Sequence, residues 1–294
     1  MFIIPVFLWI FSFLPQVASH GYVHTVLING QNYPGWNPFS DPYAISAPKV
    51  VRKIRDDGFV AATDADLPCN HLGDEGTVAV ADVDAGTQVT FKWNYWPSDH
   101  QGPVSTYMAS CNGDCAAFPA SGAKWFKLDA GGYDPATRQW AADKLRANDN
   151  SWVSTIPAEL AAGQYLIRNE IVALHSQTPQ FYPSCSQLNV RGNGTGKPSG
   201  NDLVSIPGLY SNVVWPNIYS DFGTFPIPGP QPVTFSAGGN SQLTIPTTSP
   251  RPSSTAGTHV PHTSTATPVS GSQPSAQCLL ASRRIIRRSK DNLR

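Results

Sequence analysis

Hydrophobic and β-branched residues occur along the chain in short runs that contain alternating polar positions, and clusters of Gly, Pro, Asn and Asp separate the runs. The strands predicted from this pattern lie at residues 23–28, 77–83, 88–93, 104–109, 124–128, 151–156, 164–174 and 186–190. No long stretch repeats its apolar residues with the 3.6-residue period of a helix. Many short strands separated by turns favour an all-β antiparallel sandwich or barrel.

Two regions depart from this pattern. Residues 29–70 are rich in Pro, Tyr and Trp and predict a long, functional loop region. Residues 191–230 are also irregular, and they contain the N-glycosylation sequon at Asn193. From about residue 245 the chain becomes rich in Ser, Thr and Pro, which predicts a disordered, O-glycosylated tail over 245–294 with a basic end.

The first nineteen residues, MFIIPVFLWIFSFLPQVAS, are apolar and end in small residues. This stretch is too short to span a bilayer stably and predicts a secretory signal at 1–19, with a membrane anchor as the alternative. No other segment is long and apolar enough to span a membrane. We therefore divide the chain into a signal at 1–19, a catalytic region at 20–244 and the tail at 245–294, and we expect an extracellular protein.

The formal net charge of zero conceals an uneven distribution. After residue 250 there are seven Lys and Arg against one acid, so the remaining chain has 13 basic and 19 acidic residues. A body with a net charge of −6 argues against binding to nucleic acid or to an anionic membrane surface.

Secretion permits disulfides, and four of the five cysteines lie in the body. Cys111 and Cys115 flank the turn sequence Asn-Gly-Asp, so we pair them with each other. That leaves Cys69 to pair with Cys185 and Cys278 unpaired in the tail.

Cleavage after Ser19 would start the mature chain at His20 and place a free amine and an imidazole on one residue. An α-amine has an unperturbed pKa of about 7.7–8.0, so it can lose its proton to a metal near neutral pH. One further imidazole completes a nitrogen-rich tetragonal site, which suits Cu(II). The alternative is a different cleavage site, with His20 as an ordinary strand-end residue.

Residues 170–185, EIVALHSQTPQFYPSC, form a second candidate unit. In a regular strand Gln180 and Tyr182 point to the same side, because side chains at i and i+2 share a face. A short loop can bring His175 alongside them.

The order of these segments along the chain resembles that of a known protein family. An N-terminal His-Gly is followed by HQGPVSTY, CNGDC, ALH, QFYPSC and IPGP. This set resembles the fungal lytic polysaccharide monooxygenases of auxiliary activity family 9 over about residues 20–235. The resemblance implies an immunoglobulin- or fibronectin-like antiparallel β-sandwich, with long loops that form a flat copper-bearing face.

The resemblance also implies roles for individual residues. His20 and His100 would hold one copper ion in a histidine brace, with Tyr182 as the axial residue. His175 and Gln180 would hydrogen-bond oxygen species near the metal, and Gly102-Pro103 would fix the direction of His100. The other histidines match no copper position; they are His24, His71, His259 and His262.

The implied activity is oxidative cleavage of cellulose or a related β-1,4-glucan, at C1, C4 or both. The co-substrate would be O2 or H2O2, and electrons would come from an external donor, either a small reductant or cellobiose dehydrogenase. A monomer is expected. The aromatic residues that we assign to substrate binding are Tyr33, Trp36, Tyr219 and Phe225.

Two features depart from the family pattern. Many relatives have Arg-His-Glu where this chain has Arg168-Asn169-Glu170, and position 169 has the strand parity of position 175. This parity allows Asn169 and His175 to lie on one face. Asn169 can hydrogen-bond but cannot carry a proton in the working pH range, which puts the tuning of reactivity in doubt but not copper binding. The loop between His175 and Gln180 is also short, which alters the expected surface beside the site.

Three alternatives remain at this point. The chain is a non-enzymatic copper-binding protein, or it is a hydrolase that uses two carboxylates, or zinc occupies the three-nitrogen site. No pair of acids in the sequence stands out for hydrolysis, and Gln180, His175 and Tyr182 favour the oxidative enzyme.

Overall fold

The computed structural model describes residues 20–176 and 178–235. The predicted signal at 1–19, the boundary at 244 and the tail at 245–294 lie outside the described residues. So do Cys278, His259 and His262. Within the described part of the chain there is no helix with the length and apolar character needed to cross a bilayer.

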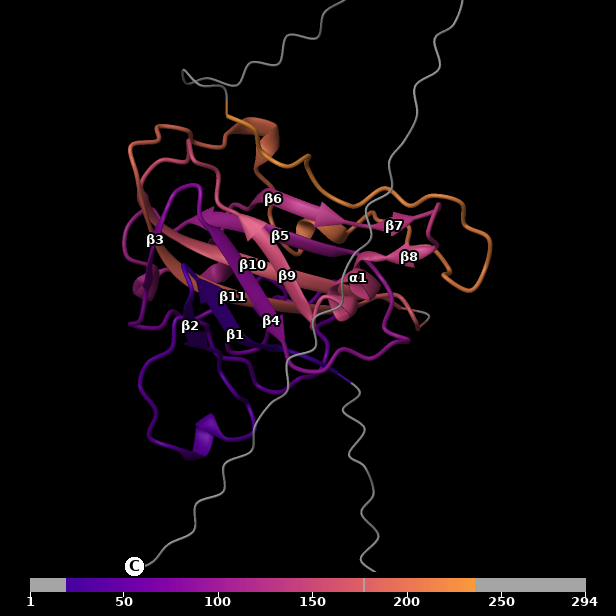
Figure 1. Cartoon of the computed structure of the whole chain (residues 1–294), viewed down its shortest axis with the longest axis horizontal. Helices are drawn as coiled ribbons and strands as arrows, with labels where there is room; N and C mark the ends of the chain where they lie inside the picture. The colour runs from indigo at the N-terminus through magenta and orange to yellow at the C-terminus, as the bar shows by residue number, and fades with distance from the viewer. Residues whose placement is uncertain (1–19, 177, 236–294) are drawn as a thin grey trace, which may run out of the picture. The chain divides into compact units, whose positions relative to one another are not determined.

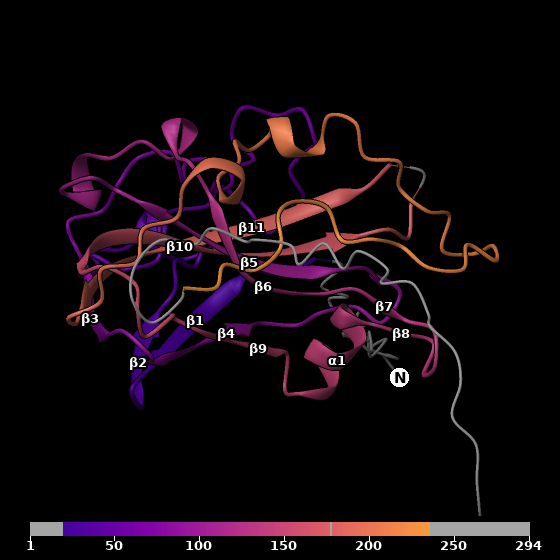
Figure 2. The ribbon, with the colours of Figure 1, turned by 90° about the horizontal axis from the view of Figure 1, so that it is seen from above.

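Most of the described strands form two sheets that pack face to face (Figure 1). The four-stranded sheet has the order β2 (Gln31–Pro34), β1 (Val23–Ile28), β4 (Gln88–Trp93) and β9 (Ser151–Thr155). The five-stranded sheet has the order β3 (Ala81–Asp84), β11 (Gln180–Arg191), β10 (Gly163–Ala173), β5 (Val104–Ser110) and β6 (Phe126–Gly131). Figure 2 shows the two layers, with β1, β4 and β9 in one and β5, β10 and β11 in the other. The predicted all-β sandwich is confirmed.

One strand pair corrects the expectation of a purely antiparallel sandwich. β3 runs parallel to β11, with Leu188 opposite Ala81 and Val190 opposite Val83. Parallel neighbours need a long connection rather than a hairpin. The chain between the end of β3 at Asp84 and the start of β11 at Gln180 supplies this connection, because it runs through β4 to β10.

Several short elements escaped the sequence pattern. β2 is a four-residue, mostly polar strand, but Asn29 and Gly30 form the two-residue turn before it, and both have positive φ. Asn-Gly is the strongest short hairpin signal, so the sequence did contain this information. The helix α1 (Ala141–Ala147) has only seven residues, too few to show a helical period; it follows the small hairpin of β7 (Tyr133–Asp134) and β8 (Gln139–Trp140).

Strand β10 is buried on both of its faces, which explains its nearly continuous apolar sequence. Ile167 and Ile171 face the core between the two sheets. Leu166 and Val172 point the other way, into a second apolar cluster under the irregular 192–235 segment. This segment runs over the outer side of the five-stranded sheet (Figure 2).

A buried ion pair fastens that segment to the sheet. The Arg168 guanidinium and the Glu170 carboxylate lie 2.5 Å apart on the outer face of β10, and the Tyr210 hydroxyl donates to Glu170 at 2.5 Å. Arg168 also donates to the carbonyl oxygens of Pro68 and Leu67. Buried charges need such partners, and these partners belong to loops far apart in the sequence.

Both predicted disulfides are present. Cys69 is bonded to Cys185, and Cys111 is bonded to Cys115. The first bridge joins the long early loop to the middle of β11, and the second closes the Asn-Gly-Asp turn after β5. The cross-link over 116 residues is expected to stabilise the fold by about 4–5 kcal/mol in a chain-entropy estimate.

Candidate functional site

The start of β1, the end of β4, the start of β5, the end of β10 and the start of β11 all lie at one end of the sandwich, because neighbouring antiparallel strands alternate in direction. The segments at this end carry His20, His100, His175, Gln180 and Tyr182. The fold therefore brings together residues that the sequence separates by up to 162 positions.

Gly21 allows the chain around His20 to lie against the 94–96 segment. A Cβ atom at Gly21 would stand 2.6 Å from the Tyr95 carbonyl oxygen and 2.9 Å from the Trp96 ring. The next residue is fixed there by two hydrogen bonds, from the Tyr22 amide to Asn94 Oδ1 at 2.8 Å and from the Asn94 amide to the Tyr22 carbonyl at 3.0 Å. Any side chain at position 21 would move His20 away from the site.

His100 is buried and held from both sides of its loop. The Trp96 indole N–H donates to the His100 carbonyl at 2.9 Å. The Gly102 backbone lies so close to β10 that an added Cβ would be 1.8 Å from the Val172 carbonyl oxygen, and the Val172 amide donates to Pro103 at 3.0 Å. The Gly-Pro turn thus fixes the His100 backbone on the neighbouring strand, as the sequence led us to expect.

Four rings meet at this end of the sandwich. The His20 and His100 rings are nearly perpendicular, with centroids 5.8 Å apart. The Tyr182 ring lies 5.9 Å from His20 and 6.3 Å from His100. His175 stacks on His100 with 3.8 Å between centroids.

Two of the ring nitrogens at this site are buried without a hydrogen-bond partner among the described residues. They are His100 Nε2 and His175 Nδ1. The other nitrogen of His100, Nδ1, lies 2.9 Å from Asp99 Oδ1, and because a carboxylate oxygen accepts, Nδ1 is the donor of this hydrogen bond. An unsatisfied buried polar group costs about 1–3 kcal/mol, which a bound metal would recover.

The donor set fits copper. Neutral imidazole nitrogens are good ligands for copper, and a phenol oxygen adds a weaker donor. His100 Nε2, the His20 ring and the Tyr182 hydroxyl are the groups that would hold the ion. The amine of His20 joins them only in a chain that begins at this residue.

Burial favours the neutral forms of His175 and Tyr182. Burial lowers the pKa of His175, and the adjacent His100 lowers it further. Burial also raises the pKa of Tyr182 well above that of a free phenol, with added contributions from Asp57 and Asp99. Tyr182 therefore stays protonated, and its hydroxyl donates to Gln180 Oε1 at 2.9 Å. The predicted pairing of Gln180 and Tyr182 on one side of β11 is confirmed.

Asn169 is buried on strand β10, and the regular strand ends at Ala173, before His175. That Asn169 and His175 share a face therefore stays a prediction. The Asn169 side chain lies in the core, where its Oδ1 accepts from the Trp93 indole at 3.0 Å and its Nδ2 donates to Thr106 Oγ1 at 3.0 Å. Asn169 supports Trp93, which packs on Trp96 behind His100.

The four aromatic residues assigned to substrate binding occupy different environments. Tyr219 is 74% exposed, and its hydroxyl donates to the His175 carbonyl at 3.1 Å, so it adjoins the ring cluster. Tyr33 and Phe225 are half-buried and pack against the two apolar clusters, and Trp36 is half-buried below the Lys53 ammonium. Contact of these four residues with substrate stays a prediction.

Sequence reasoning missed two contributors to the site. Trp96 packs edge-on against His100 at 5.8 Å and against Tyr182 at 5.0 Å, and so links the two residues. Asp99 sets the hydrogen bonding of His100, and that bond lowers the pKa of Asp99. Asp99 was detectable, because metal-binding histidines usually donate to a nearby acceptor; Trp96 was not, because its role depends on packing.

The remaining described histidines lie apart from this cluster of rings. His24 is exposed beside Thr25. The ring of His71 contacts Asp66 at 2.8 Å, and with Asp64 these residues form a small acidic group on the long loop. An acidic group of this kind is common without a metal.

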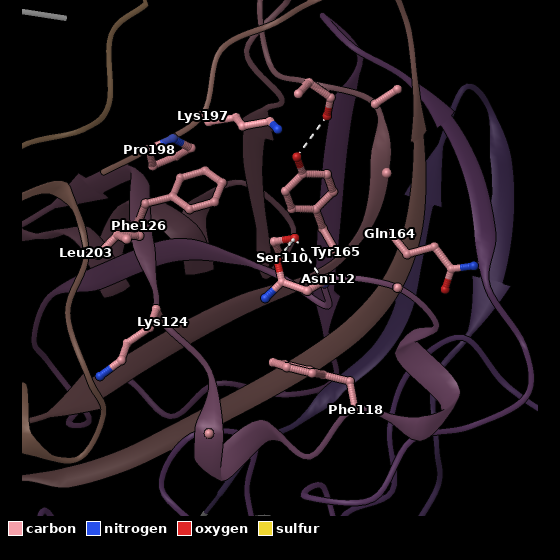
Figure 3. A pocket seen from close by; sticks show the side chains of 15 residues that line it. Ser110, Asn112, Phe118, Lys124, Phe126, Gln164, Tyr165, Lys197, Pro198 and Leu203 are labelled. Atoms are coloured by element: carbon pink, nitrogen blue, oxygen red, sulfur yellow. Dashed lines mark hydrogen bonds between the residues drawn. The ribbon is translucent and has the colours of Figure 1, made fainter. Parts of the chain in front are cut away.

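A hollow lies at the other end of the sandwich, where β5 ends and β10 begins (Figure 3). Its volume is about 510 Å³, and the rings of Phe126 and Tyr165 face it, with Lys197 at the rim. None of its lining residues is a His, Cys, Asp or Glu.

Comparison with known proteins agrees with this geometry. The family model of Auxiliary Activity family 9 (formerly GH61) matches residues 20–224. Over 231 residues the chain is 42% identical to AA9 family lytic polysaccharide monooxygenase B of Gloeophyllum trabeum. The aligned region covers 73% of this chain and 91% of that protein.

Solved structures agree as well. The extended catalytic domain of H. jecorina LPMO9A matches with a TM-score of 0.67 and 35% identity, over 74% of this chain and 92% of that one. A cellulose-active polysaccharide monooxygenase from M. thermophila matches with a TM-score of 0.65 and 35% identity, over 72% of this chain and 98% of that one.

Proposed function

The chain belongs to Auxiliary Activity family 9, the copper-dependent lytic polysaccharide monooxygenases, and from that premise we propose that it oxidatively cleaves the β-1,4-glucosidic bonds of cellulose. Oxidation would occur at C1, C4 or both, with O2 or H2O2 as co-substrate and one copper ion per chain. Electrons would come from a small reductant or from cellobiose dehydrogenase. The choice of cellulose as the substrate is supported by the similar M. thermophila protein, which is described as cellulose-active.

The observation that carries the proposal is the convergence of His20, His100 and Tyr182 around a buried, unpaired nitrogen, His100 Nε2. A hydrolase would need two carboxyl groups at the site. The described site instead presents imidazole, phenol and amide groups. When bound, copper supplies the one-electron chemistry that activates the oxygen co-substrate.

The protein contributes positioning and hydrogen bonding. Asp99 orients the His100 ring through Nδ1, and the buried Nε2 is the nitrogen that would bind the metal. The Tyr182 hydroxyl donates to Gln180 Oε1, which leaves the Gln180 amide N–H groups to donate to the co-substrate. His175, kept neutral by burial, supplies a second group to hydrogen-bond or to accept a proton beside the His100 ring.

The proposed contact with substrate is supported by the solvent exposure of one aromatic side chain. Tyr219 is the aromatic residue among our four candidates that is both strongly exposed and bonded to the site, through His175. An exposed ring next to the metal site suits the apolar face of a glucose unit. We propose Tyr219 as a substrate contact and a secreted, monomeric enzyme as the mature form, with the Asn193 sequon on its exposed surface as a glycosylation site.

The test is direct. Protein processed to begin at His20 and loaded with copper is incubated with amorphous cellulose, ascorbate and either O2 or H2O2, and products are analysed by mass spectrometry. We expect C1- or C4-oxidised cello-oligosaccharides that require both copper and reductant. Tight copper binding with no oxidised products from any β-glucan would instead support the non-enzymatic copper protein.

A further inference from the structure

The hollow of Figure 3 differs in charge from the rest of the protein. The chain up to residue 250 has 13 basic and 19 acidic residues. The charged side chains that line the hollow are nevertheless two lysines, Lys124 and Lys197, and its described lining residues include no Asp or Glu. A site that holds cations and no carboxylates inside an acidic protein attracts negative charge locally. The hollow therefore favours an anionic ligand.

Lys197 is the better placed of the two ammonium groups. In Figure 3 its side chain points toward the rings of Phe126 and Tyr165, whereas the end of Lys124 points away from them. Lys124 also donates a hydrogen bond to Ser205 Oγ at 2.7 Å. Lys197 is therefore the cation that would meet the anionic group of a ligand.

The walls of the hollow are apolar and fixed. Phe126 and Tyr165 are buried, and their rings, which face the hollow, pack edge-on with centroids 6.4 Å apart. Three half-buried residues, Phe118, Pro198 and Leu203, add apolar surface to the lining. The volume of about 510 Å³ lies within the range of about 300–1,000 Å³ that is common for small-molecule sites. Walls of this kind suit a flat aromatic ring.

The polar side chains of the lining offer donors rather than acceptors. Gln164 Oε1 already accepts from the Cys115 amide at 2.9 Å, and Asn112 Oδ1 accepts from the Ser110 hydroxyl at 3.2 Å. The Ser110 oxygen in turn accepts from the Asn112 amide at 3.1 Å. A sugar presents many hydroxyl donors and needs acceptors that these side chains already use. The lysine ammonium groups and the amide N–H groups of Gln164 are donors, and they suit a carboxylate.

We propose that this hollow is a binding site for an aromatic carboxylate, with the ring of the ligand against the apolar walls and its carboxylate on Lys197. The site lies at the end of the sandwich opposite His100. It goes beyond the proposed oxidation of cellulose and does not depend on it, because the ligand would bind far from the ring cluster.

The test compares two small molecules of the same shape. The probe is trans-cinnamate, an aromatic carboxylate without a phenol group that could reduce copper, and the neutral comparison is cinnamamide. Binding to the copper-loaded protein that begins at His20 is measured by isothermal titration calorimetry at low salt. We expect cinnamate to bind about two- to fivefold more tightly than cinnamamide, which is the contribution typical of an exposed ion pair.

A lysine pair tests the charge. Lys197→Gln should make the Kd values of cinnamate and cinnamamide equal. Lys144→Gln removes the charge of an exposed lysine outside the lining and should keep the preference for cinnamate.

A glycine pair tests the space. Gly122 lines the hollow, and an added Cβ there would have no heavy atom within 4 Å. Gly208 is equally exposed, lies outside the lining, and has its nearest atom at 4.0 Å from an added Cβ. Gly122→Leu should weaken cinnamate binding at least about tenfold, because its side chain competes for the hollow, and Gly208→Leu should leave the Kd unchanged. The melting temperature of each variant shows whether the fold has survived.

Several results would overturn the site. They are the absence of saturable cinnamate binding, equal binding of cinnamate and cinnamamide to the wild type, and unchanged Kd values in both Gly122→Leu and Lys197→Gln. A copper EPR spectrum that changes with cinnamate, together with an unchanged Kd in Gly122→Leu, would place the acid on the metal and overturn the site as well. The proposed oxidation is judged separately, by its products.

Discussion

The two ends of the sandwich differ in how their polar groups are satisfied. At the end shown in Figure 3, the Tyr165 hydroxyl donates to the Ala161 carbonyl at 2.8 Å, and Gln164 Oε1 accepts from the Cys115 amide at 2.9 Å. At the other end, His100 Nε2 and His175 Nδ1 are buried without partners among the described residues. The first end has a hollow of about 510 Å³ whose lining contains no His, Cys, Asp or Glu, and the second end has the unpaired imidazole nitrogens.

This difference shows that cavity size alone does not identify a reactive site. Single unpaired groups occur elsewhere in the described chain, such as the Trp36 indole nitrogen. What distinguishes the His100 end is that two imidazole nitrogens, His100 Nε2 and His175 Nδ1, lack partners in stacked rings. A folded protein leaves such groups unpaired where a ligand or metal satisfies them.

The largest expected effect comes from the chain start. A protein with one Ala added before His20 has its amine on the wrong residue, so the brace loses a ligand. Loss of partners of metal ligands costs about 10–100-fold in affinity or activity, and loss of a ligand itself is expected to cost about a hundredfold or more. Copper affinity is measured by competition with a chelator, and equal affinity of the extended and the His20 proteins would contradict the brace.

Copper should also stabilise the fold. At a free copper concentration 100 times the Kd, binding contributes about 2.7 kcal/mol, which raises Tm by about 5–10 °C for a domain of this size. His100→Ala should abolish the shift. The matched control, His24→Ala, removes an exposed histidine and should retain it in calorimetry with and without EDTA.

A pair of tyrosine variants compares the two ends directly. Tyr182→Phe and Tyr165→Phe each remove a hydroxyl that donates one hydrogen bond, to Gln180 and to Ala161 respectively. Each should cost about 1 kcal/mol of unfolding free energy. Only Tyr182→Phe should change the copper EPR spectrum and lower the oxidation rate, by about tenfold. An equal effect of both variants on activity would remove the distinction between the ends.

Asn169→Ala should separate folding from copper chemistry. It leaves the Trp93 indole unpaired in the core, and we expect a loss of about 1–3 kcal/mol in unfolding free energy. The copper EPR spectrum should remain that of the wild type, because Asn169 faces the core rather than the ring cluster. Asn32→Ala, at an exposed position of β2, serves as the control.

The smallest effect is expected at the rim of the far hollow. Lys197→Gln removes the charge of an exposed side chain at the end opposite His100. Oxidation of cellulose and copper affinity should both stay unchanged. A lower rate in this variant would show that the two ends of the sandwich act together.

Much of the fold could be predicted from the sequence, because the sequence signals of strands and turns are local. Strands β1 and β4 have the predicted bounds, since a half-buried strand shows alternation within six residues. The short helix α1 and the parallel direction of β3 could not be predicted from the sequence. Seven residues carry too little periodicity, and strand direction depends on how a long connection closes.

The candidate metal-site residues were likewise selected from sequence motifs and from the family resemblance, whereas their arrangement was not predicted. Spacing along β11 predicted that Gln180 and Tyr182 share a face, and their hydrogen bond agrees. The same argument for Asn169 and His175 stays a prediction, because the regular strand ends at Ala173, before His175.

The sequence by itself determined the all-β class, the cysteine pairing and the identities of the ring-bearing residues, because each of these is written in neighbouring residues or in composition. Only the tertiary structure decided which nitrogens lack partners, that Asn169 belongs to the core, and that the Tyr219 hydroxyl meets the His175 carbonyl. These properties arise from contacts between residues up to about 80 positions apart, and such contacts exist only once the two sheets and their loops have packed.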